Sequence, residues 1–249
     1  MNRIDVLGVE FDDMDIVEAV ELAMSFMDER RCAYAVTPNP EIVLASRKNR
    51  KLASAVRAAD MVLADGVGVI YASHILGTPI KNRIPGIDFA SALMARMSEC
   101  GKKVFLLGAK PGVAELAGER LSERYPGLDI CGVNDGYFEE EDNELVLEKI
   151  NAQSPDLVLV CLGAPKQEIW MKNNAELLNA GMMIGLGGAL DVFAGNVERA
   201  PEKWQKMGME WAYRLSREPK RFGRMAKLPL VLVKAAGQRV TGRRRPGVL

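Results

Sequence analysis

The amino-acid sequence predicts an α/β protein, with a doubly wound, largely parallel sheet and a C-terminal basic amphipathic helical appendage. Short apolar runs alternate with helical patterns at spacings near 25 residues, which indicates repeated strand–helix units. Several of these runs end in glycine-containing turns that open a helix. The charge and composition change at residue 201. We therefore expect an α/β core over residues 1–200 and an appendage over residues 201–249.

The expected strands are short apolar runs, as is typical of buried parallel strands. They cover residues 4–11 (a strand or a strand pair), 33–36, 61–64, 103–107, 128–133, 156–162 and 181–185. Helical patterns lie between and after these runs. The expected helices cover residues 13–30, 41–46, 66–77, 88–100 with Asp88 as its cap, and 113–124, with two more beginning near residues 139 and 166.

Asp65 follows the apolar run 61–64 and precedes Gly66 and Gly68. A carboxylate at the C-terminal end of a parallel strand lies where open α/β sheets bind their ligands. The glycines let a ligand approach the backbone, and the start of the next helix favours an anion. The alternative is that Asp65 caps this helix. Thr37 and Asn39 follow another strand, and they either share a site with Asp65 or form a capped turn.

Four glycine-containing turns follow predicted strands, at residues 66–68, 108–112, 163–166 and 185–188. None has the GxGxxG pattern of dinucleotide-binding folds or the GxxxxGK[ST] pattern of phosphate loops. All four would lie at one edge of the sheet, where their N–H groups suit a diphosphate. Together they predict a nucleotide-type ligand.

The formal net charge of zero conceals a strong asymmetry. Residues 202–249 hold 13 Lys and Arg against three Glu, a formal charge of +10, and residues 1–201 carry −10. A basic tail on an acidic core indicates a polyanionic partner, either nucleic acid or an anionic membrane face.

The tail also has an amphipathic pattern. Apolar residues recur at helical spacing at Trp204, Met207, Trp211, Ala212 and Leu215. Arg214, Arg217, Arg221 and Arg224 would share a helix face if Pro219 only kinks the helix. An apolar patch over 228–233, interrupted by Pro229, follows. This pattern favours an interfacial amphipathic segment over a solvated basic tail.

The remaining composition excludes other classes. The four cysteines lack metal-ligand spacing and are expected to be free thiols, buried in three cases. His74 has no Cys, Asp or Glu at ligand spacing and is expected to be structural. The acidic N-terminus does not fit a signal peptide, and no run of about 18 apolar residues occurs, so we expect a cytoplasmic protein.

Seven collinear motifs cover nearly the whole chain and resemble those of the WecG/TagA/CpsF glycosyltransferase family. They are ADGVGV at 64–69, RIPGID at 83–88, LLGAKPG at 106–112, NDGYF at 134–138, LGAPKQEIW at 162–170, GLGGALDVFAGNVERAP at 185–201 and EWAYRLSREPKR at 210–221. The family often has Phe-Asp where this chain reads Ala189-Leu190-Asp191. Asp191 is retained, so we expect no effect on the chemistry.

The resemblance implies a Rossmann-like core and an inverting, metal-independent transfer that uses no cofactor. It implies that N-acetylmannosamine moves from its UDP-sugar to undecaprenyl-diphosphate-linked N-acetylglucosamine at the inner face of the cell membrane. This step belongs to synthesis of the wall teichoic acid linkage unit. The resemblance also allows the uronic acid form of this sugar or another UDP-hexose as donor, for capsule or common-antigen synthesis, and the sequence does not decide among these donors.

The resemblance also assigns residues. It implies that Asp65 is the general base and that Arg214, Arg221 and Arg224 complete the catalytic site from the appendage. Thr37, Asn39, Arg83 and Gln167 would line the pocket. The other expected substrate-binding residues are Gly108, Asn134, Tyr137, Gly163, Lys166, Gly187, Gly188 and Asp191.

The residues support this chemistry independently. Inverting transfer needs a base for the acceptor hydroxyl, which contributes roughly 10²–10⁴-fold, and positive charge near the departing diphosphate. The only Asp-x-Asp, at Asp13 and Asp15, begins the first helix and is interpreted as a cap rather than a metal site. Arginines and helix N-termini remain as candidates for the positive charge.

Two other classes stay open. The basic tail would suit a nucleic-acid-binding protein, but no recognised binding motif is present. The sheet would suit an NAD-dependent oxidoreductase, but the dinucleotide fingerprint is missing. We expect a UDP-sugar, a lipid-diphosphate acceptor and an anionic membrane surface as partners, and no nucleic acid. The sequence leaves the oligomeric state undetermined.

Overall fold

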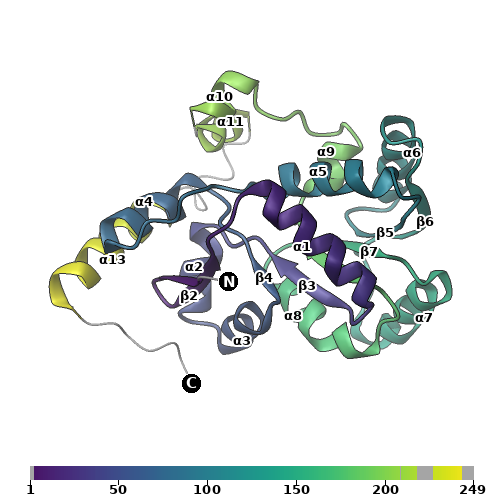
Figure 1. The fold of residues 1–249 in the computed structure, drawn as a ribbon, viewed down its shortest axis with the longest axis horizontal. Helices are drawn as coiled ribbons and strands as arrows, with labels where there is room; N and C mark the ends of the chain where they lie inside the picture. The colour runs from purple at the N-terminus through teal and green to yellow at the C-terminus, as the bar shows by residue number, and fades with distance from the viewer. Residues whose placement is uncertain (1–2, 208, 218–226, 243–249) are drawn as a thin grey trace.

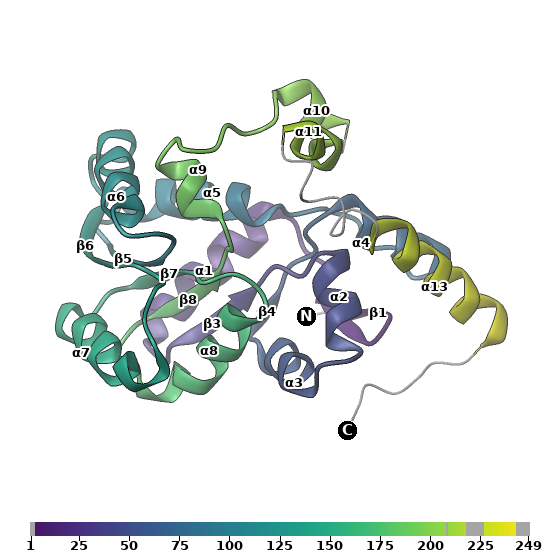
Figure 2. The same ribbon diagram turned by 180° about the vertical axis from the view of Figure 1, so that it is seen from behind.

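The computed structural model describes residues 3–207, 209–217 and 227–242, and these residues form an α/β fold around a six-stranded parallel sheet (Figures 1 and 2). The strand order is β4-β3-β8-β7-β5-β6, and every neighbouring pair is parallel. The strands are β3 (Ala33–Val36), β4 (Met61–Val62), β5 (Lys103–Gly108), β6 (Asp129–Asn134), β7 (Leu157–Cys161) and β8 (Met182–Gly185). The predicted fold class is confirmed.

Helices cover both faces of the sheet (Figures 1 and 2). Side chains of four helices belong to the core on the first face: α1 (Ile16–Glu29), α5 (Gly86–Ser98), α6 (Val113–Arg124) and α9 (Ala189–Phe193). The helices that contribute to the second include α2 (Pro40–Ser46), α3 (Arg50–Ala58), α7 (Asn143–Gln153) and α8 (Lys166–Asn174), together with α4 and α13, which are described below. The 3₁₀ turns Glu140–Asp142 and Ala175–Leu177 flank α7 and α8.

The strands are apolar throughout because both faces of the sheet are covered. In β7, Leu157 and Leu159 belong to the first core, whereas Val158 and Val160 belong to the second. All four are fully buried. Successive side chains of a strand point to opposite faces, so each strand contributes to both cores.

A separate antiparallel hairpin precedes the sheet, as the sequence allowed. It consists of β1 (Arg3–Val6) and β2 (Val9–Asp12), and it packs into the second core through Val6 and Phe11. Asp15 then caps α1 by accepting hydrogen bonds from the N–H groups of Val17 and Glu18, and Glu18 accepts one from Asp15 in return. The capping interpretation of the Asp-x-Asp motif is confirmed for Asp15.

Two local predictions differ from the structure in the core. The helix expected to begin at Asp88 begins two residues earlier, with Pro85 as its N-cap, so Asp88 is not the cap. The reason is that proline suits the start of a helix, and the Asp88 carboxylate pairs with Arg199 instead. Helix α3 was not expected, although Leu52, Ala55 and Val56 recur at helical spacing and form its buried face.

The structure of the appendage differs from its prediction more than that of the core does. The expected single helix after residue 201 is two short ones, α10 (Glu202–Lys206) and α11 (Glu210–Arg217), which lie away from the sheet (Figures 1 and 2). The shared face expected for Arg214 to Arg224 falls largely outside the described residues. The patch over 228–233 is part of a helix, α13 (Lys227–Thr241), because Pro229 lies in the first turn, where proline is tolerated.

Helix α13 packs beside α4 (Val67–Leu76) and runs parallel to it (Figure 1). Leu228 lies against Gly68 near the start of α4, and Arg239 donates a hydrogen bond to the carbonyl of Leu76 at its end. Val231 and Ala235 are fully buried. Within the described ranges, no helix is both long and apolar enough to cross a membrane.

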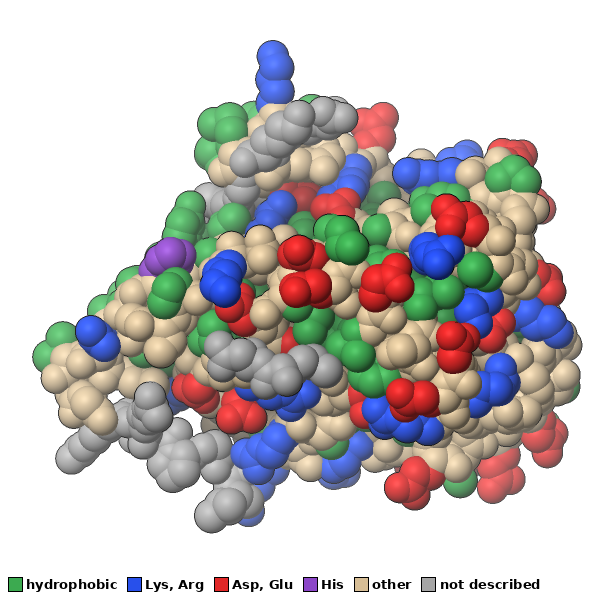
Figure 3. Space-filling view, viewed as in Figure 1, with side chains coloured by type: hydrophobic (Ala, Val, Ile, Leu, Met, Phe, Trp, Pro, Cys, Tyr) green, Lys and Arg blue, Asp and Glu red, His purple; other side chains and the backbone are tan. Residues whose placement is uncertain are grey.

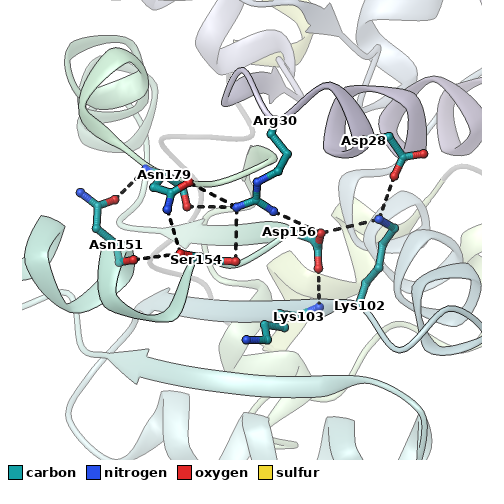
Figure 4. Close-up of polar contacts among 8 residues, drawn as sticks. All are labelled: Asp28, Arg30, Lys102, Lys103, Asn151, Ser154, Asp156 and Asn179. Carbon is teal, nitrogen blue, oxygen red and sulfur yellow. Dashed lines mark hydrogen bonds and ion pairs between the residues drawn. The ribbon is translucent and has the colours of Figure 1, made fainter.

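A polar network fixes the amino edge of the sheet, opposite the strand ends that carry the predicted site (Figure 4). Asp156, just before β7, accepts a hydrogen bond from the backbone N–H of Lys103 at the start of β5. Its other oxygen lies 3.6 Å from both Lys102 Nζ and Arg30 Nη1. Asp156 therefore joins two strands to the end of α1.

Candidate active site

A cavity of about 830 Å³ lies at the carboxyl edge of the sheet. Its walls come from the loops after all six strands of the sheet and the loop before α5, with Glu210 and Leu228 added from the appendage. Helices α2 and α8, which follow β3 and β7, cover one face of the sheet, but α9, which follows β8, covers the other. Because β8 lies between β3 and β7, its loop diverges from both neighbours and leaves a crevice.

Ten predicted site residues meet in this cavity, although the chain separates them by up to 154 positions. They are Thr37, Asn39, Asp65, Arg83, Tyr137, Gly163, Gln167, Gly187, Gly188 and Asp191. Their convergence follows from the parallel sheet, which brings the C-terminal ends of its strands to one edge. Their roles as base or ligand contacts stay predictions.

Three predicted residues are not among those that line the cavity. Gly108 ends β5 with its Cα packed against the Cys161 carbonyl, where a side chain would not fit. The Asn134 side-chain oxygen accepts a hydrogen bond from Lys149 at 2.9 Å. The Lys166 ammonium lies 4.6 Å from the centre of the Phe138 ring. Contact of these three with a ligand stays a prediction.

The appendage arginines are only partly placed. Arg214 lies in α11. Arg221 and Arg224 lie outside the described residues. Their predicted part in catalysis is therefore argued below as a proposal.

Asp65 is half-buried and lies where β4 opens into α4. Its backbone N–H donates to the carbonyl of Pro38 at 3.4 Å, which joins the loops after β4 and β3. Gly66, with φ of +98°, takes the N-cap position of α4, so the alternative interpretation of Asp65 as the N-cap residue is wrong. The positive φ favours glycine, and its small size keeps the cavity open beside Pro40.

Thr37 and Asn39 hold the neighbouring loop. The Thr37 hydroxyl is buried and donates a hydrogen bond to the carbonyl of Gly185, so it joins the ends of β3 and β8. The Asn39 side-chain oxygen accepts hydrogen bonds from the N–H groups of Glu41 and Ile42 and caps α2. The capped-turn interpretation is confirmed for Asn39, which nevertheless lines the cavity.

Gln167 is held by hydrogen bonds at both ends of its amide. Its oxygen accepts from the Gly187 N–H at 2.8 Å, and its nitrogen donates to Glu168 at 2.8 Å. The second carboxylate oxygen of Glu168 is buried and has no hydrogen-bond partner in the described structure. Burial raises the pKa of this carboxyl group, and the hydrogen bond from Gln167 opposes the rise. The pair fixes the loop after β8.

Among the described residues, the charged side chains that line the cavity are predominantly acidic. They are Glu41, Asp65, Asp191 and Glu210 on the acidic side and Arg83 and Lys110 on the basic side. Helices α2, α4, α5 and α8 begin at this edge and direct N–H groups toward it. A bound diphosphate would need additional positive charge beyond Arg83, Lys110 and these helix ends.

The lining residues that the sequence did not single out include Lys110, Glu210 and Leu228. Lys110 lies in the turn 108–112, which the glycine pattern indicated, but its side chain was not singled out. Glu210 and Leu228 come from the appendage and have no local motif. Only the packing of α13 beside α4 and the path of α11 bring them to the cavity.

No cluster of three or more His, Cys, Asp or Glu suited to a metal ion occurs among residues with described positions. His74 is exposed on the surface of α4 (purple in Figure 3). Cys32 and Cys161 are buried free thiols, as predicted, whereas Cys131 is only partly buried and Cys100 is exposed. Burial raises the pKa of the Cys161 thiol to about 12, which keeps it protonated at the cavity floor.

Comparison with known proteins agrees with this geometry. The model of the glycosyl transferase WecG/TagA/CpsF family matches residues 4–245. A Bacillus spizizenii protein named N-acetylglucosaminyldiphosphoundecaprenol N-acetyl-beta-D-mannosaminyltransferase is 36% identical over 222 residues, 89% of this chain and 86% of that protein. A Staphylococcus aureus protein of the same name is 36% identical over 236 residues, 94% of this chain and 92% of that protein. The resemblance is thereby confirmed, and the chain belongs to the glycosyl transferase WecG/TagA/CpsF family.

Proposed function

We propose that this glycosyltransferase moves N-acetylmannosamine from UDP-N-acetylmannosamine to undecaprenyl-diphosphate-linked N-acetylglucosamine, with inversion and without a metal. The names of both relatives support this donor sugar and this acceptor. The observation that carries the proposal is the cavity itself, where Asp65 and Arg83 meet the glycine-containing turns at the carboxyl edge of the sheet. This edge is where α/β sheets bind nucleotides.

The carboxylate of Asp65, in the wall of the cavity, supports its assignment as the general base. As the acceptor hydroxyl attacks the anomeric carbon, a carboxylate on its side of the sugar takes the hydroxyl proton. The bond from the anomeric carbon to the UDP oxygen breaks on the opposite face, which inverts the configuration. Negative charge then grows on the diphosphate, and Arg83, Lys110 and the helix N-termini supply part of the stabilisation.

The appendage would supply the rest of the positive charge. Four acidic and two basic side chains line the cavity, so the described wall is poorly matched to a diphosphate on its own. Arg214, Arg221 and Arg224 follow Glu210, which already lines the cavity. We assign residues 1–200 to the sugar-nucleotide core and residues 201–249 to an appendage that completes the site and docks on an anionic membrane face. That docking makes the protein peripheral at the inner face of the membrane.

The same charge balance favours a neutral donor sugar. A uronate donor brings a third negative charge into a cavity whose described wall includes Asp65 and Asp191, besides Glu41, which pairs with Lys227, and Glu210, which pairs with Arg199. We therefore favour N-acetylmannosamine over its uronic acid, and a role in wall teichoic acid linkage-unit synthesis over capsule or common-antigen synthesis.

The proposal is tested by incubating the full-length protein with UDP-N-acetylmannosamine, UDP-N-acetylmannosaminuronate or UDP-N-acetylglucosamine and a lipid-diphosphate N-acetylglucosamine acceptor. Mass spectrometry of the lipid product identifies the sugar transferred. We expect product with the first donor only. Transfer of the uronate alone would overturn the choice of donor, and absence of any transfer would overturn the proposed activity.

Asp65→Asn should lower turnover by about two to four orders of magnitude, the range for loss of a general base. The substitution keeps the size of the side chain, so UDP binding measured by calorimetry and the melting temperature should stay near those of the unchanged protein. Tyr71→Phe, on the exposed surface of α4, is the control and should not affect turnover. Near-normal turnover of Asp65→Asn would remove Asp65 from the role of base.

Chelation should not affect turnover, because arginines and helix ends are proposed to stabilise the leaving group. The measurement compares initial rates of product formation in EDTA with rates in Mg²⁺ or Mn²⁺. Loss of activity in EDTA and recovery with metal would contradict this account and would require acidic residues of the cavity to act as ligands.

A further inference from the structure

Arg199 lies behind the wall of the cavity, in the segment that joins α9 to α10. Its Nη1 donates a hydrogen bond to the Asp88 carboxylate in the first turn of α5. Its Nε lies 3.8 Å from the carboxylate of Glu210, which begins α11 and lines the cavity. One guanidinium thus reaches two separate helices that border the site.

The negative charge of Asp65 also affects the pKa of the Arg199 guanidinium. Burial lowers the pKa of Arg199, but the hydrogen bond and charge of Asp88, followed by the charges of Glu210 and Asp65, outweigh burial and raise it. Asp65, Asp88 and Glu210 come from three elements far apart in the sequence. Arg199 is the cation that they share among the residues with described side chains.

Two of the guanidinium nitrogens carry unused donors. Nε and Nη2 of Arg199 are buried and have no hydrogen-bond partner within the described part of the chain. A buried donor without a partner costs about 1–3 kcal/mol, and more when it is charged. An apolar side chain would fill the same space without the cost of these buried donors. Packing alone therefore does not explain an arginine at position 199.

We propose that Arg199 is a positioning residue of the transferase, which holds α11 against the cavity by joining Glu210 to Asp88 and whose positive charge acts on Asp65. The inference deepens the proposed function and rests on the proposed role of Asp65 as base. Helix α11 carries Arg214, so a link from Arg199 to the start of α11 places that helix relative to the reacting groups.

Arginine suits this position better than lysine. The planar guanidinium presents donors in several fixed directions and reaches Asp88 and Glu210 from different nitrogens. A lysine ammonium is a compact point charge, which would keep a positive charge that acts on Asp65 but would not span both carboxylates. Arg199→Lys and Arg199→Gln therefore separate the two parts of the role.

The expected pH dependence follows from the charges around Asp65. Among the described residues, the other charged groups that line the cavity are Glu41, Arg83, Lys110, Asp191 and Glu210, and none of them is substituted in the Arg199 variants. Removing a positive charge that acts on a carboxylate disfavours the ionised form of that carboxylate. The acid limb of the profile of kcat/KM against pH should then move to higher pH by about one unit in Arg199→Gln. In Arg199→Lys it should stay in place.

The test uses the full-length protein with the donor and acceptor given above, and it has two readouts. The first is the profile of kcat/KM against pH. The second is the rate of tryptic cleavage within residues 202–217, which reports how firmly α10 and α11 are held. Arg96→Lys is the matched control, because Arg96 forms ion pairs with Glu99 and Glu21 on the exposed side of α5.

We expect both Arg199 variants to be cleaved faster in this segment and to lose about 10- to 100-fold in kcat/KM at pH 7, since small displacements of reacting groups have effects of this size. Only Arg199→Gln should shift the acid limb. The control should change neither readout. Folded Arg199→Gln with an unshifted acid limb and an unchanged cleavage rate would overturn the inference.

If the Arg199 variants do not fold, Glu210→Gln tests the link to α11 alone. Faster cleavage of residues 202–217 supports the inference, and an unchanged rate overturns it. Asp65→Asn keeps the two proposals distinguishable. Its full activity would refute the role of Asp65, whereas the cleavage readout would still decide whether Arg199 holds α11.

Discussion

Gln167 and Glu168 are adjacent residues in the first turn of α8, but their side chains lie in different environments. Gln167 reaches the cavity and holds Gly187, whereas Glu168 is only 1% exposed and accepts its hydrogen bond from Gln167. A buried carboxylate with one unpartnered oxygen is costly when it is ionised. Glu168 therefore makes the stability of the fold depend on pH.

The sign of this dependence follows from the direction of the pKa shift. In the unfolded chain a glutamate has a pKa of about 4.3, and burial raises it in the folded protein. The stability that the protonated group contributes is full below about pH 4, the unfolded value, and is lost as pH rises through the folded value.

Glu168→Gln should therefore become more stable relative to the unchanged protein as pH rises. Glutamine keeps the oxygen that accepts from Gln167 but carries no charge. We expect a relative gain of about 1–3 kcal/mol in unfolding free energy between pH 4 and pH 8, measured by denaturant titration. Glu176→Gln, at an exposed glutamate, is the control. Equal pH dependence of Glu168→Gln and the unchanged protein would refute this account.

At the scale of single residues, the sequence indicated those whose position follows from a local rule. Asp65 and Thr37 each follow a strand of a parallel sheet, and that position alone places them at the ligand-binding edge. Arg199 and Glu210 follow no such rule. Arg199 lies in the irregular segment before α10, and Glu210 begins the short helix α11. The position of both depends on contacts between residues that are distant in the sequence.

At the scale of elements, the strongly periodic segments were predicted well. Each expected strand of the sheet appears within a few residues of its predicted position. The segments that differ depend on packing rather than on pattern. Helix α3 is short and buries only Leu52, Ala55 and Val56, and the helix predicted after residue 201 is divided in two.

Helix α13 should be held to the core by its buried face. Val231 is fully buried between α13 and its neighbours, whereas Val233 is 68% exposed. Val231→Asp would place an unpaired charge in that contact, at a cost of about 3–5 kcal/mol, so α13 should detach before the sheet unfolds. Hydrogen exchange should accelerate across residues 227–241 and stay slow in β7.

Val233→Asp is the matched control for this experiment, because the same change is made two residues away on the exposed side. Its exchange rates in α13 should equal those of the unchanged protein. Equally slow exchange of α13 in Val231→Asp would show that the helix does not depend on this contact. Simultaneous acceleration in α13 and β7 would show that α13 and the sheet unfold as one unit.

At the scale of the whole molecule, the order of the strands was the part that the sequence did not supply. Alternation of strands and helices predicted a parallel sheet, but β8, the last strand in the chain, lies between β3 and β7 in its middle. Strand order is decided by long-range pairing and by the direction of each crossover. That order creates the crevice, so the full lining of the site required the structure.

The division of charge is a property of the whole chain that has a physical consequence for the proposed membrane docking. Residues 202–249 carry a formal charge of +10 and the remainder carries −10. Near an anionic leaflet each Lys or Arg contributes about 1 kcal/mol, and the attraction decays within a Debye length of about 10 Å at 0.1 M salt. The acidic core is repelled, so the tail should face the membrane.

The full-length protein should therefore sediment with phosphatidylglycerol vesicles, but not with phosphatidylcholine vesicles, and should be released as salt rises toward 1 M. Replacing Arg243, Arg244 and Arg245 by alanine, at positions outside the described residues, should weaken binding by about 10- to 100-fold, since three charges are lost. Alanine at Lys48, Arg50 and Lys51, exposed on the core, removes the same charge and should not weaken it. Equal losses in the two triple variants would mean that net charge, rather than the tail, governs attachment.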